Sequence, residues 1–351
     1  MWYRRKTPVP FFLPAAAARR QTGRGAESIA NAAPPIQEGI SLKIVVIGAG
    51  AMGTLFGGKL ALAGAEVTMV DVVPEAVESM RRDGLVLELQ DGIHRAPVEA
   101  YLAQDVPFIA DLVILFTKSL YSRAALESAR RFMDSRTVVM SLQNGLGNLE
   151  RVSEFVPRKR IILGTTDFPS DLISIGHIRS LGDGHTSIMT AEGGETPFLQ
   201  QVCSLFDGAG LGCAITPDIM KTIWSKVAVN ATANSITAVC RLRCGVLVDT
   251  PEAGELACHI VDEIVAVAGA EGTALDGEQL KSGIFSLMAE MRTHLTSTEQ
   301  DVLAKRPTEI GSINGGVVQK ARALGIPVPY NETMYLLIRT IEQNYDGQVL
   351  S

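Results

Sequence analysis

Two features that would restrict the class of protein are missing from this sequence: long apolar runs and an excess of basic residues. No apolar run approaches the roughly 18 residues that a membrane-spanning helix requires, so we expect no membrane association. The net charge is −6 at pH 7, which argues against a surface that binds nucleic acid. Any attraction for an anionic cofactor must therefore come from local groups.

Cysteine is scarce and lacks the spacing of a metal site. The chain has five cysteines, an odd number, and Cys240 and Cys244 are not spaced as a CxxC pair. We therefore predict no bound metal and expect reduced thiols, as is usual in the cytoplasm. The predicted location of the protein is cytoplasmic.

The residues that are present are typical of a globular protein with a substantial core. Hydrophobic residues make up 46% of the chain and charged residues 20%. The length of 351 residues predicts two domains.

The first forty residues differ in kind from the rest. Six basic residues precede the first acid, Glu27, among prolines and alanines. This composition fits a targeting peptide, a disordered arm or an upstream start that is rarely used. Pro10 and Pro14 break its apolar centre, which weakens the secretory interpretation. We predict that residues 1–40 form a disordered, dispensable extension and that the fold begins near Leu42.

A glycine-rich loop between two strand-like runs is the most informative part of the sequence. The β-branched run 44–47 leads into this loop, and an apolar helical stretch follows it. In a nucleotide-binding βαβ unit, such glycines allow a tight turn, let backbone approach a pyrophosphate, and let helix and strand pack closely. The pyrophosphate then lies at a helix N-terminus, where unpaired N–H groups favour negative charge. The candidate cofactor contacts are Gly48, Ala49, Gly50, Ala51, Met52 and Gly53.

An acidic residue closes this unit. Asp71 lies at the tip of the second predicted strand, residues 67–70, eighteen residues after Gly53. A carboxylate at this point accepts hydrogen bonds from the ribose hydroxyls of NAD and repels the additional phosphate of NADP. The ordinary alternative is a solvated acid at a strand end. We predict that NADPH or NADH is the cofactor, and Asp71 favours NADH.

Strand-like and helical runs alternate up to about residue 216, and only helical runs follow. Buried strands are predicted over residues 112–116 and 137–142. The predicted fold is α/β: a Rossmann-type domain with a mostly parallel sheet over residues 41–216, then an all-helical domain over residues 217–351. Ligands of such sheets bind outside the carboxyl ends of the strands, so we expect the substrate to lie between the domains.

Two local patterns carry further predictions. Residues 177–190, with Gly182 and Gly184 between two short apolar runs, predict a hairpin that closes the first domain. Pro307 and Gly325 bracket a predicted helix, because proline is tolerated in a first turn and glycine marks a stop. The apolar face of this helix is expected to contain Ile310, Ile313, Val317, Ala321 and Leu324.

The helical domain begins with a polar strip in an apolar segment. Lys226, Asn230 and Asn234 are spaced so that on a helix each step turns by about 40°, and the three rise about 12 Å in total. A lysine in apolar surroundings can have a lowered pKa, which suits a proton donor near neutral pH. The two carboxamides could hold a hydroxyl and a carboxylate of a substrate. A helix with one solvated face would show the same residues, so both interpretations stay open.

Polar residues also follow the predicted strands. Lys118 follows the strand 112–116, and Asn144 follows the strand 137–142. Both would lie at the sheet edge that faces the cofactor, although a solvated charge and a simple turn are the ordinary alternatives. Glu309 lies in the first turn of the helix predicted after Pro307, where the helix dipole alone would explain a carboxylate.

Taken together, these pieces resemble the ketopantoate reductase (2-dehydropantoate 2-reductase) family over about residues 42–340. The glycine loop is shared with many dehydrogenases, but the segments 224–238 and 300–310 are specific to the family, and shorter matches occur at 117–118, 143–147 and 164–166. The resemblance implies that Lys226 is the proton donor and that the cofactor region is contacted by Lys118, Glu309 and Asn144. It implies substrate contacts from Asn144, Lys226, Asn230, Asn234 and Ser297.

The sequence also departs from the family. Cys244 stands where the family has a substrate-binding asparagine, Ser235 stands where proline is common, and residues 297–299 replace a run that usually ends in Ser-Met. No basic residue lies near Asp71, although relatives that use NADPH often have one there. These differences bear on the substrate and on the choice of cofactor, and not on hydride transfer itself.

The sequence therefore predicts a reductase that transfers hydride from NADPH or NADH to the 2-keto group of a small 2-keto acid, with 2-dehydropantoate as the expected substrate. Two alternatives are left open: a reductase of another small 2-keto or 3-hydroxy acid, and a dinucleotide-binding sensor without activity. A homodimer is left open as well.

Overall fold

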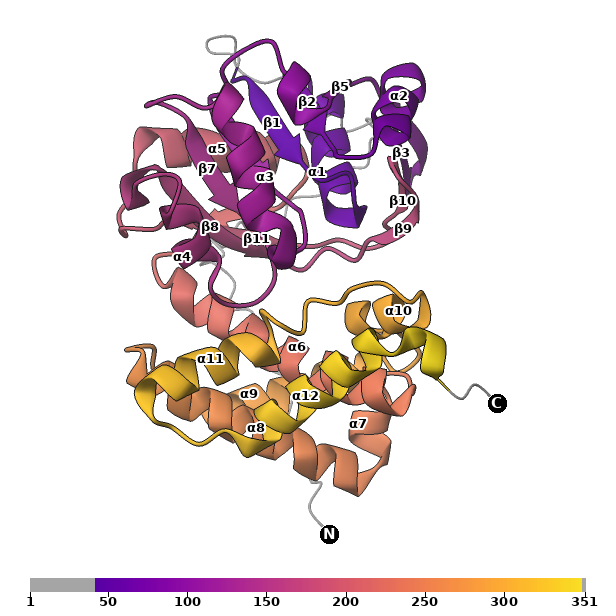
Figure 1. Ribbon diagram of the computed structural model, residues 1–351, viewed down its shortest axis with the longest axis vertical. Helices are drawn as coiled ribbons and strands as arrows, with labels where there is room; N and C mark the ends of the chain where they lie inside the picture. The colour runs from indigo at the N-terminus through magenta and orange to yellow at the C-terminus, as the bar shows by residue number, and fades with distance from the viewer. Residues whose placement is uncertain (1–41, 349–351) are drawn as a thin grey trace, which may run out of the picture. The chain divides into compact units, whose positions relative to one another are not determined.

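The computed structural model describes residues 42–348, and the extension predicted over residues 1–40 lies outside this range. The described residues divide into two compact units, residues 42–222 and residues 223–348. The first unit (indigo to magenta in Figure 1) contains two β-sheets, and the second (orange to yellow) is helical. Within residues 42–348, no helix is long and apolar enough to cross a membrane.

An eight-stranded sheet in the order β12-β11-β8-β7-β6-β1-β2-β5 forms the centre of the first unit. Its pairs are parallel except for β11 with β8, which is antiparallel. From β5 through β8, this is the 3-2-1-4-5-6 order of a doubly wound dinucleotide-binding sheet, so the predicted fold is confirmed. The strands are β1 (Ile44–Ile47), β2 (Val67–Val70), β5 (Glu99–Tyr101), β6 (Leu112–Leu115), β7 (Val138–Ser141), β8 (Ile161–Thr166), β11 (Thr186–Thr190) and β12 (Cys213–Ile215).

Helices connect the strands of this sheet. Every residue of β1, β2 and β6 is buried, which explains why these strands are apolar throughout. The α-helices of the unit are α1 (Ala51–Leu62), α2 (Pro74–Asp83), α3 (Ser122–Ala129), α4 (Asn148–Ser153) and α5 (Pro197–Gly208). The short 3-10 helices are η1 (Ala103–Asp105), η2 (Ser119–Tyr121), η3 (Arg130–Phe132) and η4 (Arg158–Arg160).

A second, four-stranded sheet in the order β4-β3-β10-β9 shows that the hairpin predicted over residues 177–190 is wrong. Residues 177–179 pair with β3 and β9 in this sheet, whereas β11 pairs with β8 and β12 in the first. A Cβ at Gly182 would lie 2.7 Å from Pro169, and one at Gly184 2.5 Å from the Phe168 ring. These glycines therefore permit close packing and do not form a hairpin turn. The strands are β3 (Leu85–Leu89), β4 (Gly92–Ala96), β9 (Asp171–Ser174) and β10 (His177–Arg179).

Helix α1 packs against both sheets through two successive glycines. A Cβ at Gly57 would lie 2.6 Å from the Met69 sulfur in β2, and one at Gly58 would overlap the Leu87 side chain in β3. The absence of side chains at these positions lets the helix approach both strands. Since α1 carries the glycine loop at its N-terminus, this packing also fixes the loop.

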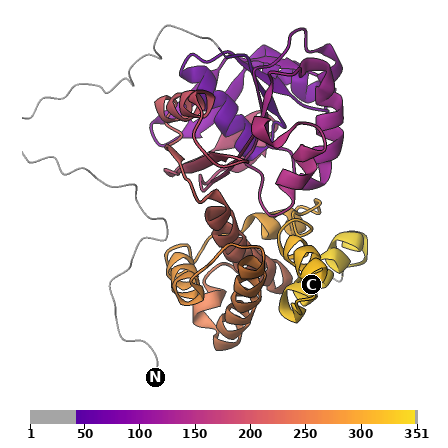
Figure 2. The ribbon, with the colours of Figure 1, turned by 90° about the vertical axis from the view of Figure 1, so that its left-hand side faces the viewer.

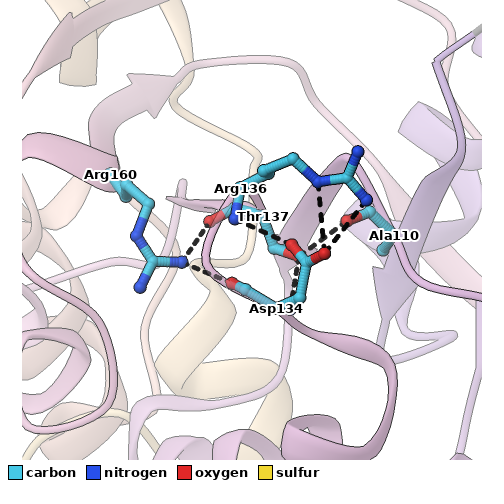
Figure 3. Close-up of polar contacts among 5 residues, drawn as sticks. All are labelled: Ala110, Asp134, Arg136, Thr137 and Arg160. Atoms are coloured by element: carbon cyan, nitrogen blue, oxygen red, sulfur yellow. Dashed lines mark hydrogen bonds and ion pairs between the residues drawn. The ribbon is translucent and has the colours of Figure 1, made fainter.

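A polar cluster holds the N-terminal ends of β6 and β7, opposite the edge that carries the glycine loop (Figure 3). Thr137 Oγ1 donates to the Ala110 carbonyl at 2.7 Å and accepts from the Asp134 N–H at 2.9 Å. Arg160 Nη1 donates to the carbonyls of Asp134 (2.7 Å) and Thr137 (2.9 Å). Hydrogen bonds from the backbone and side chain of Arg136 lower the pKa of the Asp134 carboxyl. The cluster supplements the strand ladder at this end of the sheet.

The second unit consists of helices throughout its described residues (Figure 2), as predicted. Two of its core side chains, Trp224 and Ile338, are fully buried. The boundary between the units, after Thr222, falls within the first turn of α6. The helices are α6 (Ile219–Cys240), α7 (Val246–Asp249), α8 (Pro251–Ala270), α9 (Gly277–Glu290), α10 (Ser297–Leu303), α11 (Asn314–Leu324), α12 (Pro329–Gln343) and the 3-10 helix η5 (Tyr345–Gly347).

Two fully buried asparagines tie α6 to its neighbours. Asn314 Nδ2 donates to the Ala231 carbonyl in α6 and to Asn331 Oδ1, both at 3.1 Å. Asn331 Nδ2 in turn donates to the Ile260 carbonyl at 3.2 Å and to Glu263 Oε2 at 2.8 Å. A buried amide that loses its partners costs free energy. This network therefore stabilises the position of α6 within the helical unit.

The helix predicted from Pro307 begins later than expected, at Asn314. Thr308 Oγ1 accepts the Ile310 N–H at 3.1 Å, a local hydrogen bond that competes with helix formation. The Thr308 N–H is bound to the Glu342 carboxylate at 2.5 Å. These contacts hold the segment before Asn314 in turns.

The end of this helix is confirmed, but its apolar face is shorter than predicted. Gly325 follows α11 with φ 69°, in the left-handed region that favours glycine. Leu324 is 40% exposed, whereas the other predicted face residues are buried: Ile310, Ile313, Val317 and Ala321.

Candidate functional site

The glycine loop lies at the switch point of the sheet, where β1 neighbours both β2 and β6. Gly48 has φ 102°, and a Cβ there would lie 3.0 Å from the Thr117 backbone nitrogen, in the loop after β6. A Cβ at Gly53 would overlap the Gly48 carbonyl oxygen. At Gly50, by contrast, nothing lies within 4 Å of the Cβ position. Gly48 and Gly53 are thus required by the protein's own packing, whereas Gly50 borders open space.

The residues of this loop fit the pyrophosphate of a dinucleotide. No side chain caps α1 at Gly50, and the first turn of α1 contains no acidic residue. Backbone N–H groups at such an end carry partial positive charge and bind anions. With the open space at Gly50, this arrangement can receive phosphate oxygens without displacing a side chain.

Asp71 connects the tip of β2 to the glycine loop. Its Oδ2 accepts the Ala49 N–H at 2.9 Å, and its Oδ1 accepts the N–H groups of Val72 (2.8 Å) and Val73 (3.1 Å). A carboxylate has about four acceptor positions, and three of them are occupied here, so one is left for a ribose hydroxyl. The next residue, Val72, is 88% exposed. The side chain that follows Asp71 is therefore apolar and exposed to solvent.

The loops that carry Lys118 and Asn144 are neighbours, as the sequence predicts. Strands β6 and β7 pair in parallel up to Leu115 and Ser141. Beyond that point, Gln143 Nε2 donates to the Thr117 carbonyl at 2.6 Å. The residue before Asn144 thus contacts the residue before Lys118, and both predicted side chains are half-buried.

The predicted polar strip lies on α6 and becomes more buried along the helix. Lys226 and Asn230 are half-buried, and Asn234 is 6% exposed. The side chains beside them, Val227 and Ala231, are buried. The end of the strip at Asn234 is therefore shielded from solvent, whereas Lys226 and Asn230 are partly exposed.

Ser297 contacts this strip directly. Asn234 Nδ2 donates to Ser297 Oγ at 3.2 Å, which joins two predicted substrate contacts 63 residues apart in the chain. One turn along α6, Thr237 Oγ1 pairs with Thr296 Oγ1 at 2.8 Å. Ser297 accepts from Asn234, so its own hydroxyl hydrogen remains for an acceptor such as a carboxylate oxygen.

Two residues that depart from the family pattern described above are buried in the same region. Glu299 is 2% exposed, and its carboxyl group accepts from the Thr296 backbone, while its own N–H donates to Thr296 Oγ1 at 3.4 Å. This is a reciprocal capping box at the start of α10. Cys244 is 1% exposed, and burial, aided by the charge of Glu299, raises the pKa of its thiol. A protonated thiol cannot replace the two strong hydrogen bonds of an asparagine amide.

The buried carboxyl group of Glu299 leads to a prediction for stability against pH. Burial raises its pKa above the unfolded value of 4.5, so the folded protein binds this proton more tightly. The resulting stability is present below pH 4.5 and is lost as pH rises through the folded pKa. Glu299→Gln keeps a capping side chain but cannot ionise, so we expect its melting temperature to exceed that of the wild type at about pH 8.

The control for this prediction is Glu78→Gln, at an exposed position in α2. The advantage of Glu299→Gln should shrink as the pH approaches 4.5, and Glu78→Gln should show no such trend. A difference between Glu299→Gln and wild type that stays constant across this range would contradict the assignment.

Glu309 lies in the turn before α11, and its carbonyl accepts the N–H groups of Ser312 (3.0 Å) and Ile313 (3.1 Å). It is half-buried. Because the helix begins at Asn314, the helix dipole does not explain this carboxylate, and that prediction is wrong. Its expected contact with the cofactor region stays a prediction.

Sequence reasoning missed the residues that hold the site in place. The capping box at Thr296 and Glu299 has a sequence signal, S/T-x-x-E. Gln143 directly follows a strand and precedes a glycine-rich turn, which is a weaker signal. No sequence signal marks Asn314 and Asn331, because their hydrogen-bond partners lie on other helices. Within the described part of the chain, no group of His, Cys, Asp and Glu side chains is arranged to hold a metal ion.

This fold and this loop define the class of the protein: a dinucleotide-binding α/β unit followed by a helical unit. Residues 44–193 match the family model Ketopantoate reductase PanE/ApbA, and residues 218–342 match the model of its C-terminal part. The chain belongs to the ketopantoate reductase family.

Individual relatives agree with this placement. The chain is 31% identical to a 2-dehydropantoate 2-reductase of Halobacterium salinarum, over 86% of this chain and 100% of the relative. It is 29% identical to a 2-dehydropantoate 2-reductase of Vibrio cholerae, over 87% and 99%.

Solved structures of related enzymes have a similar fold. A D-mandelate dehydrogenase with NADH and anilino(oxo)acetate has a TM-score of 0.82 and 28% identity, covering 86% of this chain and 99% of that one. A PanE/ApbA family ketopantoate reductase from Ralstonia eutropha JMP134 has a TM-score of 0.79 and 29% identity, with the same coverage.

Proposed function

We propose that this protein is an NAD(P)H-dependent reductase that converts 2-dehydropantoate to pantoate. The observation that carries the proposal is the α6 strip, which begins at Lys226 and whose buried end is hydrogen-bonded to Ser297. The curated relatives named above carry the same activity in their names. The reaction also needs a site for the dinucleotide, and the glycine loop fits the pyrophosphate of such a cofactor.

Each polar residue of the site has a distinct task in this reaction. The glycine loop and Asp71 would hold the dinucleotide, whose reduced nicotinamide would provide the hydride for the ketone carbon. Lys226 polarises the ketone oxygen and gives it a proton as negative charge develops there, a contribution of about 10²–10⁴ in rate. Ser297, oriented by Asn234, donates to the substrate carboxylate. Such orientation makes the reaction effectively unimolecular.

Asn144 and Asn230 complete the proposed contacts with the substrate. Asn144 lies at the carboxyl end of β7, the edge where ligands of such sheets bind, and contacts both the cofactor and the substrate. Asn230 lies one turn from Lys226 and orients a substrate hydroxyl. Lys118 and Glu309 contact the cofactor region.

We propose NADH as the preferred cofactor because Asp71 faces the glycine loop and Val72 follows it. Asp71→Ser with Val72→Arg removes the negative charge and adds a cation for the additional phosphate. We expect the ratio of kcat/KM for NADPH to that for NADH to rise at least tenfold in this double variant, an effect of about 1.4 kcal/mol.

Initial rates with each cofactor at fixed keto acid would measure this ratio. Val73→Arg is the control, because it adds the same cation one residue further along, at a position that is 36% exposed in the wild type. It should leave the ratio of kcat/KM for the two cofactors closer to the wild-type value than the double variant does. A wild-type preference for NADPH that the double variant leaves unchanged would contradict the role of Asp71.

A second candidate function is reduction of a bulkier 2-keto acid. It is favoured by Cys244, whose buried side chain is smaller and less polar than the asparagine that the family has there, and by the similar structure of a D-mandelate dehydrogenase with NADH and anilino(oxo)acetate. Initial rates with 2-dehydropantoate, 2-ketoisovalerate and phenylglyoxylate separate the two. The first proposal expects the highest kcat/KM with 2-dehydropantoate, and a preference for phenylglyoxylate would favour the second.

A further inference from the structure

Gln143 links the two strand-end loops that carry Lys118 and Asn144. Its side chain is 9% exposed. Nε2 donates to the Thr117 carbonyl at 2.6 Å and to Ser122 Oγ at 2.8 Å, with Thr117 Oγ1 also at 3.3 Å. Oε1 accepts from Ser141 Oγ at 3.0 Å. Both polar atoms of this amide are therefore engaged, with Ser141 at the end of β7, Thr117 after β6 and Ser122 at the start of α3.

The orientation of this amide is dictated by its surroundings. The Thr117 carbonyl can only accept a hydrogen bond, so the Gln143 NH₂ group must face it. Rotation of the amide by half a turn would place two carbonyl oxygens against each other. The backbone ladder between β6 and β7 has ended at Leu115 and Ser141. This side chain therefore replaces the ladder over the next residues.

Asn148 secures the other side of the same loop. Its Nδ2 lies 3.2 Å from the Gln143 carbonyl, 3.3 Å from the Asn144 carbonyl and 3.4 Å from the Gly145 carbonyl. Arg151 Nη1 donates to Asn148 Oδ1 at 2.9 Å. The backbone on both sides of Asn144 is thus held by side chains rather than by a strand or helix.

The link extends to the glycine loop through Thr117. The Cβ position of Gly48 lies 3.0 Å from the Thr117 nitrogen and 3.2 Å from the Phe116 carbonyl carbon, so the two backbones are in contact. Any shift of Thr117 must therefore move the glycine loop, Lys118 or both. The Gln143 amide thus joins the loops after β7 and β6 directly, and the loop after the adjacent strand β1 contacts the backbone at Thr117.

We propose that Gln143 is a positioning residue that sets the spacing between Asn144, Lys118 and the glycine loop, and so places the bound nicotinamide against the keto acid. The proposal rests on the function proposed above. Gln143 acts through its neighbours and has no contact with the reacting atoms in this account. A misplacement of the reacting groups by about 1 Å can reduce a rate by about 100-fold. Substitution of Gln143 should therefore slow the hydride-transfer step itself.

The test compares Gln143→Met with Thr137→Val in the full-length protein. Both remove buried hydrogen bonds between β6 and β7, one at the carboxyl ends and the other within the cluster of Figure 3 at the amino ends. We expect similar losses of a few degrees in melting temperature. Only Gln143→Met should lower kcat by about 10- to 100-fold and raise the deuterium isotope effect on kcat with C4-deuterated NADH.

Gln143→Glu provides a second measurement that a purely structural role would not move. The introduced carboxyl group has one donor when protonated and none when ionised. Its kcat relative to wild type should therefore recover as the pH falls, because only the protonated form can donate to the Thr117 carbonyl. Thr137→Val should show no such recovery.

The outcomes separate this inference from the proposed function. Wild-type turnover with equal kcat and isotope effects in Gln143→Met and Thr137→Val would overturn the positioning role and leave the function intact. If the wild type reduces no keto acid, the proposed function fails. The positioning role is then decided by NADH binding alone, where a dissociation constant in Gln143→Met equal to that in Thr137→Val would overturn it.

Discussion

Replacing Lys226 with alanine should lower kcat for reduction of 2-dehydropantoate by about 10²–10⁴-fold, the usual contribution of a general acid. The ammonium group is expected to act only as negative charge develops on the ketone oxygen, so the loss should appear in kcat more than in KM. Steady-state rates with saturating cofactor would measure the two separately.

Two further variants separate proton donation from other effects of this change. Lys226→Arg keeps the positive charge but has a pKa too high to release a proton near neutral pH, so it should remain severely impaired. Lys221→Ala removes an exposed lysine from the start of the same helix and should retain wild-type rates. Activity of Lys226→Arg close to wild type would show that charge alone suffices and that the proton comes from elsewhere.

The second large effect is expected at the glycine loop, where one alanine substitution should weaken NADH binding alone and another should also reduce stability. Gly50→Ala places a methyl group in open space, at a backbone φ of −72° that alanine readily adopts. It should leave the melting temperature within a few degrees of wild type and raise the dissociation constant for NADH by at least about tenfold, because the methyl group occupies the space proposed for the pyrophosphate.

Gly53→Ala should show the opposite pattern. Its Cβ would overlap the Gly48 carbonyl oxygen, which is backbone and cannot move without displacing the loop. We expect a loss of stability of about 1–3 kcal/mol, comparable with overpacking of a core, accompanied by weaker NADH binding. Thermal denaturation and NADH titration of both variants provide the comparison. Unchanged NADH affinity in Gly50→Ala would exclude this loop as the pyrophosphate site.

Much of the fold was predictable because its signals are local. The order of strand, glycine loop, helix, strand and Asp71 lies within thirty residues, and the structure places these elements as expected. The strip from Lys226 to Asn234 was also visible, because helical periodicity depends on residues four apart. In both cases the prediction depended only on residues close together in the sequence.

The wrong predictions depended on partners that lie far away in the chain. Residues 177–179 resemble the first arm of a hairpin, but they are the second arm of a hairpin with β9 and also pair with β3, about ninety residues earlier. Glycines at 182 and 184 resemble a turn, although they serve to pack against Phe168 and Pro169. At Pro307 the pattern for a helix start was present, but the Thr308 N–H is bound to the carboxylate of Glu342, 34 residues later, and the segment before Asn314 stays in turns.

The residues that support the site were hidden for the same reason. Asn234 could be chosen from the sequence, but its contact with Ser297 spans 63 residues. Gln143, Asn314 and Asn331 act through carbonyl groups on other elements. Amide side chains of this kind are common in loops and helices, so their burial distinguishes them only once the fold is known.

The most direct test of the central claim is to follow the fate of the hydride. The protein would be incubated with 2-dehydropantoate and NADH or NADPH carrying deuterium at both C4 positions, and the product analysed for its chemical identity and the position of the label. We expect pantoate with deuterium at C2 and an equimolar amount of oxidised cofactor. Failure to oxidise either cofactor with any 2-keto acid, or a product without deuterium at C2, would contradict it.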